Sequence, residues 1–316
     1  MKNLTIGVHI LGRDAPSLVD RILAADRAGL DVAWQSVGGV APDPFVVFAA
    51  AAARAARIEF GAAVVPTYPR HPLALAQSAM AIDQIAPGRL RLGVGPSHKP
   101  AIQGTWGLPF DSPHTHLREY LIILNAILKE GNVSFHGEIL HAEAQIPAPT
   151  QVRVMASALR PKAFRLCGEL ADGAISWLCP LSYIRDVAAP ALREGASQTG
   201  RPPPAMIVHA PVVVSQDADA VLSAVRRQFA FYPRLPYYSR MLQQAGFPEA
   251  AAAEFTDAMA RALVIFGSAD QVAQRLAELP GYGVDELLAS IVLLPDDPQP
   301  AVARTLALLG ELAQAH

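Results

Sequence analysis

The chain has 316 residues, of which 52% are hydrophobic and 17% are charged, and its formal net charge is −2. An average domain carries about 25% charged residues, so this composition predicts a large interior and gives no sign of a nucleic-acid or anionic-membrane partner. The longest apolar run, residues 45–53, is also much shorter than the roughly 20 residues of a membrane span.

Short apolar strand segments alternate with amphipathic helical segments from end to end. Helices are predicted near 16–29 and at 44–57, 71–86 and 114–130, with a long loop before the last of these. Strands are predicted at 5–10, 32–36, 58–65, 89–95, 152–158, 173–177, 206–214 and 286–294. Many are unbroken runs of Val, Ile, Leu and Ala, which is typical of parallel strands buried on both faces. Eight such units predict an α/β fold, the (β/α)8 TIM barrel, with residues 1–316 as a single domain. A doubly wound open sheet is the alternative, although it would normally carry a glycine loop after the first strand.

Two segments interrupt this alternation. Residues 131–146 alternate in polarity and contain turn glycines, so they predict a small hairpin before the fifth strand. Residues 233–260 mix aromatics, prolines and helix formers, which favours short helices over the mouth of the barrel. Long loops at this end often act as lids, and an inert decoration or an oligomer contact is the alternative.

The first residues and the cysteines both indicate a cytoplasmic protein. The sequence MKNLTIGVHILGRD lacks the long apolar core and the small-residue cleavage site of a signal peptide, so we interpret it as containing the first strand. Cys167 and Cys179 are the only cysteines. We expect both to be free thiols in a reducing cytosol.

The stretch RLRLGVGPSHKP, residues 89–100, resembles a phosphate-binding loop but lacks its essential features. A dinucleotide-binding loop needs the pattern G-x-G-x-x-G, and His98 occupies the third glycine position after Gly93 and Gly95. Pro96 also removes a backbone N–H that a pyrophosphate would need. The end of this strand therefore requires another explanation.

In a TIM barrel the active site lies at the carboxyl ends of the strands. The residues expected there are His9, Gln35, Ser36, 63–66, 95–98, Ser157, Ala158, Ser176, Trp177 and His209. This set contains no pair of carboxylates for a glycosidase or an enolase, and none of the four lysines falls inside a predicted strand, which disfavours a Schiff-base aldolase. No His-x-His pair ends a strand, so a hydrolytic metal centre is also disfavoured. An apolar, aromatic rim with scattered His and Ser suits a large planar organic cofactor.

The order of motifs resembles the luciferase-like family of flavin- and F420-dependent oxidoreductases. The run VVPTYPRHPLALAQSAMAIDQIAPGRLRLGVG (64–95) contains the family pattern R-x-P-x-x-x-A-x-x-x-x-x-x-D, here Arg70, Pro72, Ala76 and Asp83, followed by a Gly-Arg turn and a strand that ends in glycines. The segments 163–177 and 264–287 also resemble family motifs in the same order, so the resemblance covers nearly the whole chain.

The resemblance implies a TIM barrel with a cofactor ring across its mouth and the cofactor phosphate beyond the fifth and sixth strands. It also implies a bulge in the third strand, often with a non-prolyl cis peptide, which by position would be Ala63-Val64. The expected cofactor-binding residues are Gln35, Ser36, Ala63, Val64, Gly95, Pro96, Ser97, His98, Ser157, Ala158, Leu159, Arg160 and Trp177. Gly95 would let the backbone pass close under the ring, and Arg160 at a helix start is the best phosphate candidate.

Three further residues carry a choice between a functional and a structural role. His98 is the candidate catalytic residue, as a hydrogen-bond or proton donor, or else it orients its loop. His9 would line the substrate pocket or be a satisfied core histidine. Trp106 would cover the ring or anchor the loop after the fourth strand.

The function predicted from this resemblance is hydride transfer between coenzyme F420 and an apolar or aromatic small-molecule substrate. The resemblance also implies a homodimer, because members of the family commonly dimerise. Residues 97–111 most resemble F420-using members, which favours F420 over FMN. An FMN-dependent monooxygenase and a non-catalytic cofactor-binding homologue are the alternatives. Sugar-phosphate dehydrogenases of the family end the second strand in Asp-His and place a Glu after the fourth; here these positions hold Val37-Gly38 and His98, so sugar-phosphate chemistry is not carried over.

Overall fold

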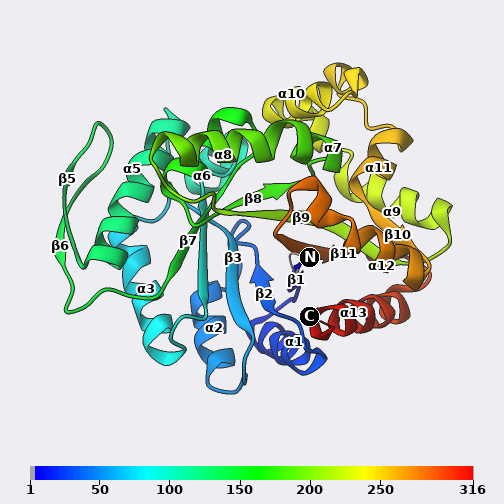
Figure 1. Cartoon of the computed structure of the whole chain (residues 1–316), viewed down its shortest axis with the longest axis horizontal. Helices are drawn as coiled ribbons and strands as arrows, with labels where there is room; N and C mark the ends of the chain where they lie inside the picture. Colours follow the sequence, from blue (N-terminus) through cyan, green and yellow to red (C-terminus); the bar gives the residue numbers. More distant parts are fainter. Residues whose placement is uncertain (1–3, 316) are drawn as a thin grey trace.

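A computed structural model describes residues 4–315. The main sheet has the strand order β10-β9-β11-β1-β2-β3-β4-β7-β8, and β8 pairs back to β9, which closes a parallel barrel (Figure 1). The barrel strands are β1 (Thr5–His9), β2 (Val32–Gln35), β3 (Glu59–Pro66), β4 (Leu90–Gly95), β7 (Arg153–Ser157), β8 (Gly173–Trp177), β9 (Ala205–Val214) and β11 (Glu286–Ile291). The predicted TIM barrel is therefore confirmed, and the open sheet is excluded.

Helices surround this barrel, and their apolar faces pack against the outward side chains of the strands. The helices that follow the strands are α1 (Ala15–Ala28), α2 (Pro44–Ala52), α3 (Pro72–Ile85), α4 (Lys99–Trp106), α5 (Pro113–Asn125) with η1 (Ala126–Glu130), α6 (Pro161–Leu170), α7 (Leu181–Tyr183) with η2 (Ile184–Ala188) and α8 (Ala189–Gln198), α9 (Ala218–Phe229), α12 (Ala269–Ala277) with η5 (Leu279–Tyr282), and α13 (Pro298–Gln314). No helix in the described part of the chain is long and apolar enough to cross a membrane.

Three local predictions were wrong. The helix predicted over 44–57 ends at Ala52, because the Asp26 carboxylate accepts hydrogen bonds from the backbone N–H groups of residues 56–58 and leads the chain into β3. The long loop predicted after the fourth strand contains α4, which Gly107 ends in a left-handed conformation. The short strand β10 (Ile265–Gly267) was not predicted, because its few residues carry too little periodicity.

The two interrupting segments have defined structures. Residues 131–146 contain β5 (Asn132–His136) and β6 (His141–Gln145), an antiparallel hairpin that stands away from the barrel in Figure 1. The Glu119 carboxylate accepts hydrogen bonds from the N–H groups of residues 138–140 and fixes the hairpin turn. The second segment contains η3 (Tyr232–Arg234), α10 (Pro236–Gln244), η4 (Pro248–Ala252) and α11 (Asp257–Leu263).

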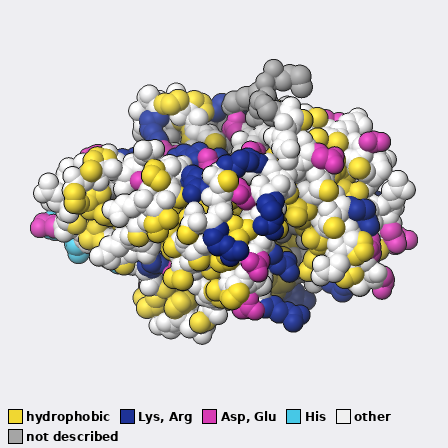
Figure 2. Space-filling view, turned by 90° about the horizontal axis from the view of Figure 1, so that it is seen from below, with side chains coloured by type: hydrophobic (Ala, Val, Ile, Leu, Met, Phe, Trp, Pro, Cys, Tyr) yellow, Lys and Arg dark blue, Asp and Glu magenta, His cyan; other side chains and the backbone are white. Residues whose placement is uncertain are grey.

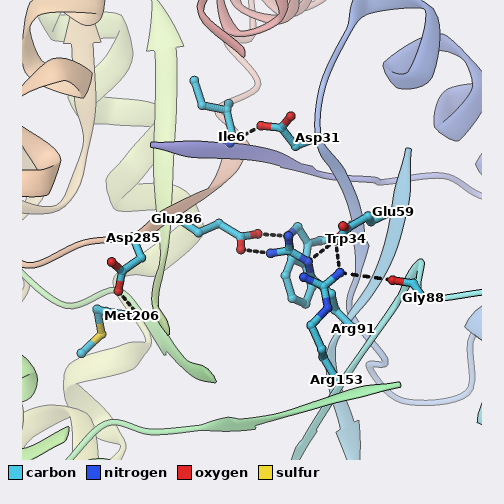
Figure 3. A network of polar contacts seen from close by, with 10 residues as sticks. All are labelled: Ile6, Asp31, Trp34, Glu59, Gly88, Arg91, Arg153, Met206, Asp285 and Glu286. Atoms are coloured by element: carbon cyan, nitrogen blue, oxygen red, sulfur yellow. Dashed lines mark hydrogen bonds and ion pairs between the residues drawn. The ribbon is translucent and has the colours of Figure 1, made fainter. Parts of the chain in front are cut away.

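The interior of the barrel is filled from its base by charged and aromatic side chains. Trp34 is fully buried inside the barrel, and Gly7 and Gly61 leave the room that its indole needs: a Cβ on Gly61 would lie 2.2 Å from the ring and a Cβ on Gly7 2.7 Å. The indole N–H donates to Glu286 Oε1 at 2.9 Å. Glu286 also forms an ion pair with Arg91, and Arg91 forms a second ion pair with Glu59 (Figure 3).

The surface carries both signs of charge. On the face shown in Figure 2, Lys and Arg side chains gather near the middle, and Asp and Glu side chains lie beside them among dispersed hydrophobic groups.

Candidate functional site

The mouth of the barrel is lined by the last inward-facing side chains of the strands. Side chains alternate between the two faces of a strand, and the inward set includes Trp34, Ile207 and Leu288. The inward set at the carboxyl ends, which we call the mouth layer, is His9, Ser36, Val64, Gly95, Ser157, Trp177, His209 and Ser290. None of these eight residues is an Asp or a Glu, so the mouth layer holds no fixed negative charge.

His9, the last residue of β1, is held between two serines. Its Nε2 lies 2.9 Å from Ser36 Oγ, and its Nδ1 lies 3.4 Å from Ser290 Oγ. Burial lowers the pKa of His9 to about 4. The imidazole is therefore neutral at physiological pH, and its ring contacts the His209 ring edge-on, with 5.2 Å between centroids.

His209 lies in the mouth layer between His9 and Trp177. Its side chain is 7% exposed, and its ring centroid is 4.0 Å from that of Trp177. Burial, followed by the neighbouring His9, lowers the pKa of His209 well below its ordinary value. Within residues 4–315, Nε2 of His209 has no hydrogen-bond partner. Because buried polar atoms almost always have a partner, this atom is a candidate contact for a bound molecule.

Aromatic side chains from the segment after β9 cover the mouth. We call Phe229, Tyr232 and Tyr238 the aromatic cover. The Trp177 indole N–H donates to Tyr232 Oη at 2.7 Å, and Tyr232 packs edge-on against Tyr238 at 4.7 Å. The Tyr238 ring reaches His98, at 5.8 Å, so the cover spans from β8 to the start of α4.

The third strand has the bulge that the family resemblance implies. The Ala63-Val64 peptide is cis, and the pairing of β3 with β4 shifts register between Ala62 and Val65. The prediction for this peptide is therefore confirmed. Thr67, which follows the strand, is buried, and its Oγ1 has no partner among the described residues.

Gly95 is in close contact with its neighbours. A Cβ at this position would lie 2.2 Å from Ser157 Oγ and 2.9 Å from Val64 Cγ2. The room that this glycine leaves is therefore occupied by two other side chains of the mouth layer. This packing by itself requires a glycine, and the predicted clearance under a cofactor ring stays a prediction.

The remaining predicted residues lie in several different places. Gln35 and Ala158 face outward; Gln35 Nε2 donates to the Pro42 carbonyl at 3.4 Å, and Ala158 belongs to the outer core. Trp106 ends α4 and is 40% exposed. The Leu159 carbonyl accepts a hydrogen bond from Tyr183 Oη at 3.0 Å.

The turn from β4 into α4 contains the other predicted residues. Pro96 and Ser97 form this turn, with Ser97 in the left-handed region at φ 63°. His98 is the N-cap of α4, and burial lowers its pKa, so the imidazole is neutral near pH 7.

Helices α4 and α6 begin at the mouth without side-chain caps, as do α7 and α13. His98 precedes α4 and Arg160 precedes α6, and neither side chain accepts a hydrogen bond from the first turn of its helix. The N–H groups of these turns, together with the helix dipole, favour a phosphate or another anion. Arg160 Nη1 donates to Gln244 Oε1 of α10 at 3.1 Å, which places a guanidinium beside the start of α6.

Sequence reasoning missed part of this site. His209 was recognised as a strand-end residue but was not chosen, and Ser290 and the aromatic cover were not identified. The alternation of side chains along a strand could have identified His209 and Ser290, because Ile207 and Leu288, two residues earlier in the same strands, face the interior. No signal separates Tyr238, which is 6% exposed, from its neighbour Tyr237, which is 53% exposed.

Comparison with known proteins gives a family and a shared fold. The sequence model of the luciferase-like monooxygenases matches residues 6–286. An uncharacterised protein of Mycobacterium tuberculosis is 28% identical over 301 residues, which cover 85% of this chain and 88% of that protein. The 5,10-methylenetetrahydromethanopterin reductase of Methanopyrus kandleri is 24% identical over 335 residues, which cover 94% of this chain and 95% of that protein.

Solved structures agree with these sequence matches. The coenzyme F420-dependent tetrahydromethanopterin reductase from Methanopyrus kandleri has a TM-score of 0.79 at 22% identity and covers 99% of both chains. The oxygenating constituent of 3,6-diketocamphane monooxygenase from Pseudomonas putida, in complex with FMN, has a TM-score of 0.74 at 19% identity, covering 98% of this chain and 97% of that chain. At these identities the structural matches establish the fold alone.

Proposed function

Because the chain belongs to the luciferase-like monooxygenase family, we propose that it is an oxidoreductase that transfers a hydride between coenzyme F420 and an apolar or aromatic substrate. The observation that supports this proposal most is the chemistry of the mouth layer: it is uncharged and partly aromatic, and His209 Nε2 is buried there without a partner among the described residues. The similarity to the methylenetetrahydromethanopterin reductase and to the coenzyme F420-dependent tetrahydromethanopterin reductase of Methanopyrus kandleri supports the choice of F420.

The residues present fit a flat cofactor that has a polar edge and a phosphate. The unpartnered buried atom Thr67 Oγ1 offers a hydrogen bond to a polar edge. The uncapped starts of α4 and α6 offer N–H groups, and Arg160 adds a positive charge beside the second. A neutral mouth with aromatic walls also suits an apolar substrate.

When bound, F420 would supply a deazaflavin carbon that gives or takes a hydride. The residues of this chain would then have separate tasks. Ala63 and Val64 would support the ring from the third strand, and Arg160 would bind the phosphate. His98 would hydrogen-bond the cofactor or hold a proton at its neutral imidazole. The aromatic cover would exclude water from the mouth.

The proposal is tested by titrating the purified protein with F420 and, separately, with FMN, following absorbance. We expect F420 to bind more tightly than FMN, and His98→Ala to weaken F420 binding or slow its reduction. His136→Ala is the matched control, because this histidine lies on the hairpin with its side chain 65% exposed. Its binding should equal that of the wild type.

The other outcomes separate the alternatives. Tighter binding of FMN would favour a flavin-dependent monooxygenase, to which the diketocamphane monooxygenase with FMN is similar in fold. Binding of F420 without turnover across a broad substrate panel would favour a non-catalytic homologue. Binding of neither cofactor would overturn the proposal. A cytoplasmic location and a homodimer stay predictions, and size-exclusion chromatography tests the second.

A further inference from the structure

The unpartnered nitrogen of His209 has a defined setting. The side chain is inward-facing in β9, is 7% exposed, and packs on Trp177. Its other close aromatic neighbour is His9, which contacts it edge-on. A ligand atom that replaced the missing partner of Nε2 would therefore lie inside the barrel mouth, between the strands and the aromatic cover.

His9 connects His209 to solvent. Its two ring nitrogens meet Ser36 Oγ at 2.9 Å and Ser290 Oγ at 3.4 Å, so the ring is held from both sides. Ser36 is exposed, whereas His209 is buried. The order His209, His9, Ser36 therefore runs from the interior of the mouth to its rim, with an edge-on ring contact between the two imidazoles and a hydrogen bond from His9 to Ser36.

The charge around this pair restricts the ligand. The groups packed on the two imidazoles are Trp177, Ser36 and Ser290, all of which are neutral. An anionic ligand would find no cation among the residues of the mouth layer, and burial of an unpaired charge is costly. A neutral oxygen, by contrast, would satisfy Nε2 with one hydrogen bond.

We infer that His209 is a catalytic residue that binds the oxygen of a neutral alcohol or carbonyl substrate through Nε2, and that His9 is its positioning residue. This inference rests on the proposed hydride transfer. In oxidation, neutral His209 with its proton on Nδ1 would take the alcohol proton at Nε2 and become an imidazolium, the hydride would leave the carbinol carbon for the F420 of the proposed function, and the C–O bond would become C=O. In reduction, the imidazolium would give its Nε2 proton to the carbonyl oxygen while the carbonyl carbon takes the hydride, and His209 would return to its neutral form.

The test compares two neutral aromatic probes that differ in one oxygen-containing group. Acetophenone carries the carbonyl, and ethylbenzene lacks it. We expect His209→Leu to weaken acetophenone binding about tenfold, which corresponds to the loss of one hydrogen bond, and to leave ethylbenzene binding unchanged. His136→Leu on the hairpin is the control and should change neither.

A spectroscopic measurement needs no variant. In the wild type, added acetophenone should shift the ¹⁵N resonance of His209 Nε2, and the infrared carbonyl stretch of the bound ketone should move to lower frequency. The infrared shift should disappear in His9→Ala, where the ring of His209 is free to turn, and should return in His9→Gln, which can bond both serines. An unchanged Nε2 resonance, or equal losses for both probes in His209→Leu, would overturn the inference.

The two proposals fail in different ways. The probe measurements are made on the protein with and without F420. If F420 binds but acetophenone makes no contact with His209, the inference is wrong and the proposed function stands. If acetophenone contacts Nε2 but F420 does not bind, the contact with the oxygen is supported and the proposed cofactor is wrong.

Discussion

The two ends of the barrel solve the same problem, polar side chains inside a closed sheet, in different ways. At the base, Arg91 pairs with Glu59 and Glu286, and Glu286 also accepts the Trp34 N–H (Figure 3). At the mouth, His209 Nε2 has no partner among the described residues. Polar groups at the base satisfy one another, whereas the mouth keeps a buried polar atom that, in our proposal, a ligand contacts. Substitutions at the base should therefore mainly change the free energy of unfolding, and substitutions of His209 should mainly change ligand binding.

The largest expected effect is on the base. Arg91→Leu would leave Glu286, which is 2% exposed, as a buried carboxylate without its cation. Removal of one partner of a buried ion pair costs about 3–5 kcal/mol, and we expect a loss of that size in urea unfolding. Arg153→Leu is the matched control: this arginine also bonds Glu59, but its side chain is 38% exposed, so its loss should cost about 1 kcal/mol or less. Equal losses would show that the base is not a closed network.

The pH dependence should have opposite signs at the two ends. Burial raises the pKa of Glu286 to about 7 from its ordinary 4.5, so the stability that this group contributes is present below pH 4.5 and is lost as the pH rises to about 7. Burial lowers the pKa of His9 to about 4 from its ordinary 6.5, so its contribution is present above pH 6.5 and is lost as the pH falls to about 4.

Two variants separate these opposing slopes. Glu286→Gln removes the contribution of the base, so its unfolding free energy should rise with pH between 4.5 and 6.5 more steeply than that of the wild type. His9→Gln removes the contribution of the mouth and should show the reverse. Each pKa unit corresponds to about 1.4 kcal/mol, so the effect of Glu286 is expected to reach roughly 3 kcal/mol. Parallel pH profiles for all three proteins would contradict this assignment.

The fold could be predicted because its signals are local. Eight apolar segments with helices between them determine the barrel, and alternation within each strand places Ser157 and Trp177 inside the mouth. The same alternation places Gln35 and Ser36 on opposite sides of the second strand, because neighbouring residues of a strand point to opposite faces. The cis peptide at Ala63-Val64 was accessible only through the resemblance to a family.

The parts that could not be predicted depend on contacts between distant segments. Arg91 and Glu286 are 195 positions apart, and no local pattern pairs them. Asp26 ends α2 through residues about 30 positions later in the chain. Tyr238 reaches His98 because α10 lies over the mouth, a placement that depends on the tertiary packing of the whole segment.

The smallest expected effect is at Gly95, and it tests how tightly the mouth is packed. Gly95→Ala would place a Cβ 2.2 Å from Ser157 Oγ, and overpacking of this kind costs about 1–3 kcal/mol. The double variant Gly95→Ala/Ser157→Gly should recover part of the loss, because Val64 Cγ2 would still lie 2.9 Å away. Gly104→Ala is the control: nothing lies within 4 Å of its Cβ, and in helix α4 it should stabilise by about 0.5–1 kcal/mol. A Gly95→Ala variant as stable as the wild type would show that the side chains of the mouth layer shift to make room for the added Cβ. The two ends of the barrel would then differ in rigidity, with a rigid base and a mouth that can adapt to its ligand.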